Sequence, residues 1–273
     1  MDPIITQPEF EGNYTDKFVF NIGGNLDLLR RTISNRTVGI CLQGASLHIL
    51  ENTIKKFESL DICWAGINRF NVIQDYILNQ INKPLEIVLD IADVARADDY
   101  DKAVRIPRLE TFIKKNEGGV ILTKVSILEN MLKVSKTVAL NPKHSCVFLD
   151  TDNCNFCIPN SLTLYLFLLT RYGAKQIVLF GLDGLTQNHT LLTAYYRIES
   201  LLKERQIGFG NKHLCYLHLD AALFNTSFLG LYTKYCVEQN VIPLKIWNCN
   251  PDSYFTLFPK ISHEKIREQL WLN

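Results

Sequence analysis

Short apolar runs recur along this chain, and longer amphipathic segments separate them; no other feature constrains the fold as strongly. Most of these runs are continuously apolar, which is typical of strands buried on both faces of a sheet. Strands that alternate with helices predict an α/β fold, here a Rossmann-like, mainly parallel sheet with helices on both faces. The expected strands are Phe18–Ile22, Val38–Leu42, Leu60–Trp64, Leu85–Leu89, Val120–Thr123, Cys146–Leu149, Ile177–Phe180, Leu214–Leu217 and Ile242–Trp247.

The segments between these strands show helical spacing of apolar residues. Leu47, Leu50, Ile54 and Phe57 fall on one face of a helix that Ser46 can cap. Residues 161–172 are apolar nearly all round, so a helix there is expected to be buried. Further helices are expected over residues 70–81, 191–203, 224–238 and 261–270. We expect one domain spanning residues 1–273, with a small lid over about residues 184–215.

The charge balance excludes some classes of function. The 273 residues hold 29 Lys and Arg against 28 Asp and Glu, so no nucleic-acid partner is expected. No apolar run is long enough for a transmembrane helix, and Met1-Asp2-Pro3 lacks the basic start of a signal peptide. Several of the eight cysteines lie inside apolar runs, as reduced thiols do. The expected location is the cytoplasm, which leaves peripheral contact at the inner face of the membrane open.

The first candidate site is the turn Gly44-Ala45-Ser46, which follows a buried strand and begins a helix. Free N–H groups at a helix start, with a glycine that admits close approach, suit a phosphate. The turn matches neither the G-x-G-x-x-G nor the Walker pattern. The alternative is a tight strand-to-helix turn with a plain serine cap. If the turn binds phosphate, Gly44→Val is expected to block binding and leave the fold intact.

Three more candidates follow buried strands, at the edge where open α/β sheets bind ligands. Asn68 either contacts a ligand or caps a helix. Asp183 ends the run Gly181-Leu182-Asp183, where it either bonds a ligand hydroxyl or caps a turn. His218 follows the run Leu214–Leu217, so it is either a general base facing a cleft or a structural histidine.

Two sequence patterns could bind a metal ion, but each is only weak evidence for a metal site. Asp150-Thr151-Asp152 follows a strand and could bind a divalent cation through both carboxylates, but a polar loop is the preferred interpretation. Cys154-Asn155-Phe156-Cys157 lacks the second pair that a structural zinc site needs. No metal or other cofactor is therefore expected.

Taken in chain order, several segments resemble a known group of proteins. The segments are Gln43-Gly44-Ala45-Ser46-Leu47, the run 61–70, Pro159-Asn160-Ser161, Gly181-Leu182-Asp183 and Asn248-Cys249-Asn250-Pro251-Asp252-Ser253. In this order they resemble the bacterial lipooligosaccharide sialyltransferases and the related 6-hydroxymethylpterin diphosphokinase-like (MptE-like) domain. The resemblance implies a GT-A-like variant of the Rossmann-like fold.

The resemblance implies a glycosyltransferase that needs no metal. It would move sialic acid or a related sugar from a CMP-activated donor to a hydroxyl of a glycan acceptor. The implied roles are phosphate contact for Gly44, Ala45 and Ser46, nucleotide contact for Asn68, Asn160, Ser161 and Asp183, donation to the leaving phosphate for Tyr195 or Tyr196, and base catalysis for His218.

Two alternatives stay open. One is a magnesium-dependent MptE-like diphosphokinase, for which Asp90 and Asp183 are the candidate metal ligands. The other is a nucleotide-binding protein of the same fold without turnover, which would lack a base in the cleft.

Overall fold

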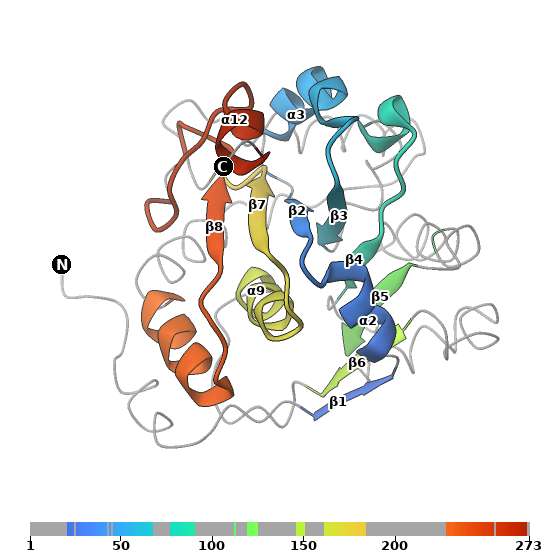
Figure 1. Ribbon diagram of the computed structural model, residues 1–273, viewed down its shortest axis with the longest axis vertical. Coiled ribbons are helices and arrows are strands. Elements are labelled where there is room, and N and C mark those ends of the chain that lie inside the picture. Colours follow the sequence, from blue (N-terminus) through green and yellow to red (C-terminus); the bar gives the residue numbers. More distant parts are fainter. Residues whose placement is uncertain are drawn as a thin grey trace, which may run out of the picture.

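The computed structural model describes the residues that build one open α/β sheet and the helices that cover it (Figure 1). The described residues are 21–24, 26–42, 44, 46–67, 77–90, 112, 119–124, 146–150, 161–183, 228–253 and 255–271. The strands are β1 Asn21–Gly24, β2 Thr37–Cys41, β3 Ile62–Ile67, β4 Ile87–Asp90, β5 Val120–Lys124, β6 Cys146–Asp150, β7 Gln176–Phe180 and β8 Lys245–Asn248. The helical elements are α2 Leu26–Ile33, α3 Leu47–Thr53, α9 Ser161–Arg171, α12 Ile266–Trp271, the 3₁₀ turns η1 Ile54–Phe57 and η3 Leu78–Ile81, and a helix over residues 228–239.

The eight described strands form one sheet in the order β1-β6-β5-β4-β3-β2-β7-β8. Strands β2 to β8 pair in parallel, and β1 pairs antiparallel with β6. At the centre, Thr37 of β2 lies opposite Ile62 of β3 on one side and Gln176 of β7 on the other. The chain fills the sheet from β2 towards β6 and then returns to add β7 and β8 on the other side of β2. The direction of winding therefore reverses between β2 and β7.

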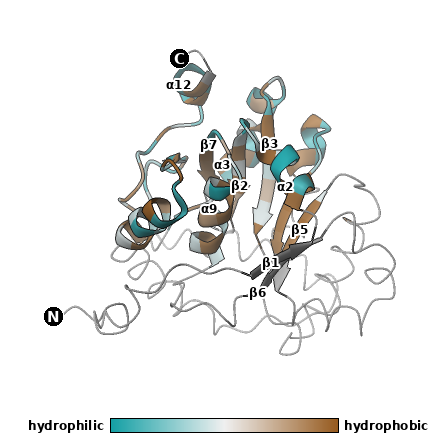
Figure 2. Ribbon diagram, turned by 60° about the horizontal axis from the view of Figure 1, so that its bottom comes forward, coloured by the Kyte–Doolittle hydropathy of each residue, from teal (hydrophilic) through white to brown (hydrophobic). Residues whose placement is uncertain are grey.

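One face of the sheet packs against α2, α9 and the helix over residues 228–239, and together they form the main hydrophobic core. Strand β2 turns Val38 and Ile40 towards this core. Helix α9 is buried over residues 162–170, and Figure 2 shows it hydrophobic along its length. Phe167 of α9 stacks on Tyr235 with 4.4 Å between ring centroids, which joins the two helices. The apolar character of α9 all round follows from this position between two apolar surfaces.

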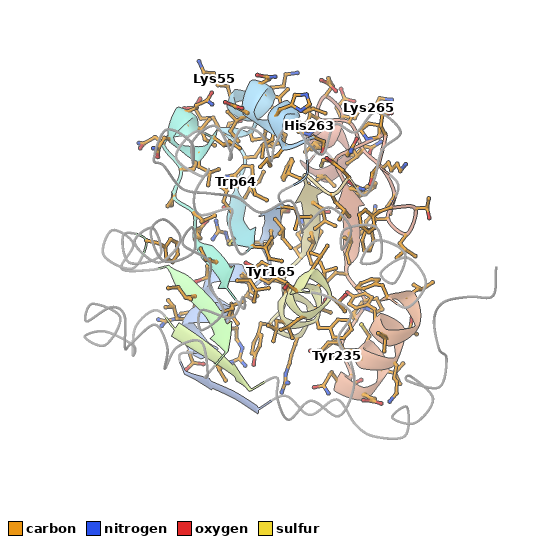
Figure 3. All side chains as sticks on the ribbon, turned by 180° about the vertical axis from the view of Figure 1, so that it is seen from behind. Lys55, Trp64, Tyr165, Tyr235, His263 and Lys265 are labelled. Carbon is orange, nitrogen blue, oxygen red and sulfur yellow. The ribbon has the colours of Figure 1, made fainter. Side chains whose placement is uncertain are left out.

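The opposite face packs against η1 and the C-terminal segment. Trp64 of β3 and Phe180 of β7 have ring centroids 5.6 Å apart, and Phe57 of η1 meets both rings edge-on. His263, just before α12, packs edge-on against Phe57 and Phe180 and is 6% exposed. Figure 3 labels His263 where the C-terminal segment meets α3 and η1. Around β2, β3 and β7 the described residues thus cover the sheet on both faces, and the predicted α/β fold class is confirmed.

Charged side chains join three strands at the amino edge of the sheet. Arg36 precedes β2, Asp61 precedes β3, and Glu86 precedes β4. The Arg36 guanidinium donates to both oxygens of Glu86 at 2.6 and 3.0 Å and to Asp61 at 3.0 Å. The hydrogen bond that Arg36 donates to Glu86 is the main cause of its raised pKa. This cluster ties the strand starts together at the end of the sheet opposite the expected ligand edge.

Several expected elements differ in detail from the observed ones. Strand β3 begins two residues later and ends three residues later than predicted, because Ala65, Gly66 and Ile67 are also buried strand residues. Strand β8 begins at Lys245, and Ile242 is 85% exposed before it. Helix α2 was not predicted. Helix α12 begins later than expected, at Ile266. The predicted strand at Leu214–Leu217, the helix over 191–203 and the lid over 184–215 lie outside the described residues.

Candidate functional site

The carboxyl ends of β2 and β7 are the place in this fold where a ligand site is expected. Open α/β sheets bind ligands beyond the carboxyl ends of their strands, at the point where the direction of winding reverses. Here that point lies between β2 and β7, which are hydrogen-bonded neighbours. The loops that leave these strands carry Gly44 and Ser46 on one side and Gly181 and Asp183 on the other.

The two loops are in direct contact through their main chains. The Gly44 N–H donates to the Gly181 carbonyl oxygen at 3.0 Å, and the Leu42 N–H donates to Phe180 at 2.8 Å. A Cβ atom on Gly44 would lie 2.4 Å from the Gly181 carbonyl oxygen and 2.6 Å from Asp183 Oδ2. Gly181 has a φ of +76°, a conformation that glycine adopts at little cost. Both glycines are therefore required by the close approach of the loops.

The Asp183 carboxylate lies at the centre of this contact and is only 2% exposed. Its Oδ2 accepts the Ser46 N–H at 2.8 Å, and its Oδ1 accepts the Ser46 hydroxyl in a short hydrogen bond. Oδ1 also accepts the Asn250 side-chain amide at 2.8 Å. All three donors are neutral. A carboxylate offers about four acceptor positions, so the described residues occupy most of them.

A third loop, which follows β8, closes the arrangement. The Asn248 side-chain amide donates to the Leu182 carbonyl oxygen at 3.2 Å. The Ser253 hydroxyl lies 2.6 Å from the same oxygen and 3.2 Å from the carbonyl oxygen of Asp183. We call Gly44, Ser46, Asp183, Asn250 and Ser253 the switch-point corner. All five are buried, and loops from three neighbouring strands provide them.

Gly44, Ser46 and Asp183 were all predicted as site residues, and the structure brings them together. The expected Ser46 cap is wrong, because its side chain donates to Asp183 and makes no cap hydrogen bond with α3. The free N–H groups expected for a phosphate are also not found at Gly44, Ser46 or Leu47, which donate to Gly181, Asp183 and Gly44.

The expectation that Gly44→Val leaves the fold intact is wrong as well. The position has no room for a side chain, because backbone and carboxylate atoms already lie where the Cβ would be. A valine there would disturb the corner itself, so loss of ligand binding in that variant would not locate a phosphate.

The remaining predicted site residues are not brought into the corner by the described structure. Ser161 begins α9, is half-buried and makes no hydrogen bond to the corner residues. Ala45, Asn68, Asn160, Tyr195, Tyr196 and His218 lie outside the described residues, as do Asp152, Cys154 and Cys157.

The candidate metal ligands are spread along the sheet edge. Asp90 ends β4, three strand steps from β7, and Asp150 ends β6, five steps away. Because neighbouring strands lie about 4.8 Å apart, these steps correspond to roughly 14 and 24 Å. The strands that precede Asp183 and end at Asp90 are therefore not neighbours in the sheet. Within the described part of the chain, no group of three or more His, Cys, Asp or Glu could hold a metal ion.

The described cysteines fit the expected reduced state. Cys41, Cys63, Cys236 and Cys249 are free and buried. Burial is the main cause of a raised pKa in each thiol, so the reactive thiolate form is disfavoured. These thiols are core residues rather than nucleophiles.

Comparison with known proteins does not assign the chain to a family. No protein-family model matches it, and no curated protein sequence matches it. Across the described residues, no helix is long and apolar enough to cross a membrane. The family resemblance of the sequence segments stays a prediction.

Sequence reasoning missed the roles of Asn248, Asn250 and Ser253. The signal was present, since the run Asn248–Ser253 places polar residues directly after a buried strand. The run is one of the segments that carry the family resemblance, but no function was predicted for any residue in it. What the sequence lacked was the position of β8 next to β7, which puts this run against Asp183.

Proposed function

We propose that this protein is a glycosyltransferase that transfers a sugar, sialic acid or a related one, from a CMP-activated donor to a hydroxyl of a glycan acceptor. One observation carries the proposal. Gly44, Ser46 and Asp183, which belong to two segments 137 residues apart in the chain, meet at the winding reversal of the sheet. The same segments carry the sequence resemblance to nucleotide-sugar transferases.

The chemistry of the corner suggests how the donor would lie. Asp183 places a buried negative charge there, and the amides of Gly44, Ser46 and Leu47 already have protein acceptors. An anionic phosphate gains little from such surroundings, whereas hydroxyl groups are neutral and can donate. We propose that the sugar hydroxyls of the nucleotide lie nearest the corner. The phosphate would then lie farther from the Asp183 carboxylate.

The reaction itself needs two further contributions from this chain. The phosphate charge that develops as CMP leaves must be stabilised, and Tyr195 or Tyr196 is the proposed donor. The acceptor hydroxyl must lose a proton, and His218 is the proposed base. His218→Ala is then expected to lower the turnover rate by roughly 10²–10⁴-fold and to leave nucleotide affinity unchanged.

A ligand screen by thermal unfolding tests the proposal. CMP, UDP, GDP, ATP and their sugar conjugates are each added to the wild-type protein. A ligand that binds the folded state alone raises Tm, by roughly 5–10 °C at a hundredfold excess over Kd for a chain of this size. We expect the largest rise with CMP or a CMP-sugar. Asp183→Asn should reduce that rise, and Asp27→Asn, at an exposed carboxylate, serves as the control.

The outcomes separate the classes of function. If no nucleotide or nucleotide-sugar shifts Tm, the proposed function is wrong. If a different nucleotide base is selected, the CMP assignment is wrong. If a CMP-sugar binds and is neither transferred nor hydrolysed, the protein is a nucleotide-sugar-binding protein without turnover.

A further inference from the structure

Asn250 contacts the central carboxylate of the corner, and its own orientation is fixed. Its side-chain oxygen accepts the Asp252 N–H at 3.0 Å, so its amide nitrogen must be the atom that faces Asp183 at 2.8 Å. Its backbone N–H donates to the Asn248 side-chain oxygen at 3.1 Å. Asn250 is 4% exposed and Asn248 is fully buried. The Asn250 side-chain oxygen and the Asn250 backbone N–H are thus both hydrogen-bonded within this loop, and its side-chain nitrogen is directed at the Asp183 carboxylate.

The same loop also holds the main chain on both sides of Asp183. Asn248 and Ser253 donate to the Leu182 carbonyl oxygen, and the Ser253 hydroxyl is within reach of the Asp183 carbonyl oxygen. Lys260 adds a hydrogen bond of 2.6 Å to the Ser253 carbonyl oxygen. Both the backbone and the side chain of Asp183 are therefore held by Asn248 at the end of β8 and by residues that follow this strand.

We infer that Asn250 is a positioning residue, which fixes the Asp183 carboxylate and through it Ser46 and the loop after β2. Among the described residues of the corner, Asp183 is the one side chain that contacts both the loop after β2 and the loop after β8. Where this concerns ligand binding, the inference rests on the proposed function. Its structural part, the coupling from Asn250 to the Ser46 amide, does not.

The structural part is tested by amide hydrogen exchange, read at single residues by NMR in the wild-type protein and in Asn250→Ala. The Ser46 amide donates to Asp183, so loss of the Asn250 contact should raise its exchange rate by about 10-fold or more. The Lys175 amide, which donates to Arg36 at the opposite edge, reports any general destabilisation. An unchanged ratio between Ser46 and Lys175 would overturn the inference.

A swap of the two side chains distinguishes positioning from simple packing. Asn250→Asp places two carboxylates in contact and should raise exchange at Ser46 further. Asp183→Asn combined with Asn250→Asp restores one amide against one carboxylate at similar volume. We expect this double variant to recover protection at Ser46 and part of any nucleotide affinity. If the double variant is as exchange-prone as Asn250→Asp, the inference is wrong.

Nucleotide affinity is then measured on the same variants. Under the proposed function, Asn250→Ala weakens CMP or CMP-sugar binding by about 10-fold, and the swap recovers it in part. If the wild-type protein binds no nucleotide but Ser46 exchange still responds to Asn250, the proposed function fails and the positioning role stands. If nucleotide binds and neither Ser46 exchange nor affinity responds to Asn250, the positioning role fails alone.

Discussion

At the scale of single residues, Gly44 is a position with no room for a side chain, because a Cβ there would lie 2.4 Å from the Gly181 carbonyl oxygen. Gly44→Ala should lower the free energy of unfolding by about 1–3 kcal/mol, because backbone atoms must move to admit the methyl group. Gly230 is the matched control, with nothing within 4 Å of its Cβ position on an exposed part of the helix over residues 228–239.

Gly230→Ala should instead stabilise the protein by about 0.5–1 kcal/mol, through helix propensity. Urea unfolding followed by circular dichroism measures both changes. Equal effects of the two substitutions would show that the loops after β2 and β7 are not packed as closely as described.

His263 gives the protein a defined dependence on pH. Burial is the main reason that its pKa falls to about 4, and its Nδ1 lies 2.8 Å from Thr53 Oγ1. The groups that also act on it are Glu264, which raises the pKa, and Lys56 and His48, which lower it. Between about pH 4 and pH 6.5 the unfolded chain binds a proton at this residue and the folded chain does not.

The contribution of His263 to the free energy of unfolding should therefore be constant above about pH 6.5 and should decrease as the pH falls from 6.5 to 4. The loss from this one group is at most about 3 kcal/mol. His263→Gln should remove this part of the slope in urea titrations at several pH values. His48→Gln, at an exposed histidine of α3, removes only a minor lowering influence on the His263 pKa and should keep most of the slope. A His263→Gln protein with the full wild-type slope would contradict the assignment.

At the scale of elements, the amino ends of β2, β3 and β4 depend on one side chain. Arg36 is 25% exposed and pairs with Glu86, which is 23% exposed, as well as with Asp61. Arg36→Gln should lower the free energy of unfolding by about 1–3 kcal/mol, since charge-assisted hydrogen bonds are lost at a half-buried site. Arg36→Lys keeps the charge but cannot bridge both carboxylates. Its free energy of unfolding should therefore lie between those of the wild-type protein and Arg36→Gln.

Arg30 is the control for this prediction. It pairs with Asp27 at 3.5 Å, and both side chains are largely exposed, so Arg30→Gln should have little effect. Thermal unfolding of both variants at two salt concentrations measures the two losses of stability. A loss for Arg36→Gln no larger than for Arg30→Gln would show that the cluster does not join the strand starts.

The elements also show how far a sequence of this kind can be interpreted. Strands such as β2, β5 and β7 were predicted within a residue or two, because both faces are buried and the runs are continuously apolar. Helix α2 was missed, although Leu26, Leu29 and Ile33 have helical spacing, because the segment is short and carries two arginines. Small buried residues such as Gly66 give no hydrophobic signal, so the end of β3 was misplaced.

The candidate site was predictable in part for a related reason. Parallel strands end at one edge, so Gly44 and Asp183 could be expected at the same edge from the sequence. Their direct contact depends on β2 and β7 being neighbours in the sheet. The paired residues Thr37 and Gln176 are 139 positions apart, so no local sequence pattern predicts this pairing. The part played by Asn250 depends in turn on β8 joining β7.

At the scale of the whole molecule, the strand order bears on metal dependence. Asp90 and Asp150 end strands that lie three and five steps from β7, so the strand order does not favour an ion shared with Asp183. If the protein turns over a CMP-sugar, turnover should survive excess chelator and the Asp152→Ala change. Donor hydrolysis measured with and without chelator tests this. Loss of activity that magnesium or manganese restores would contradict the metal-independent mechanism.

The central pairing of β2 with β7 also has a consequence for how the chain is made. Thr37 finds its Gln176 partner only after 139 further residues have been synthesised, which takes roughly 7 to 28 s at about 5–20 residues per second. Until then one edge of β2 has no strand to pair with, and an unpaired apolar edge favours aggregation. The corner forms later still, because Asn250 comes 67 residues after Asp183. The nascent chain should therefore need shielding by a chaperone during the interval between the synthesis of β2 and that of β7.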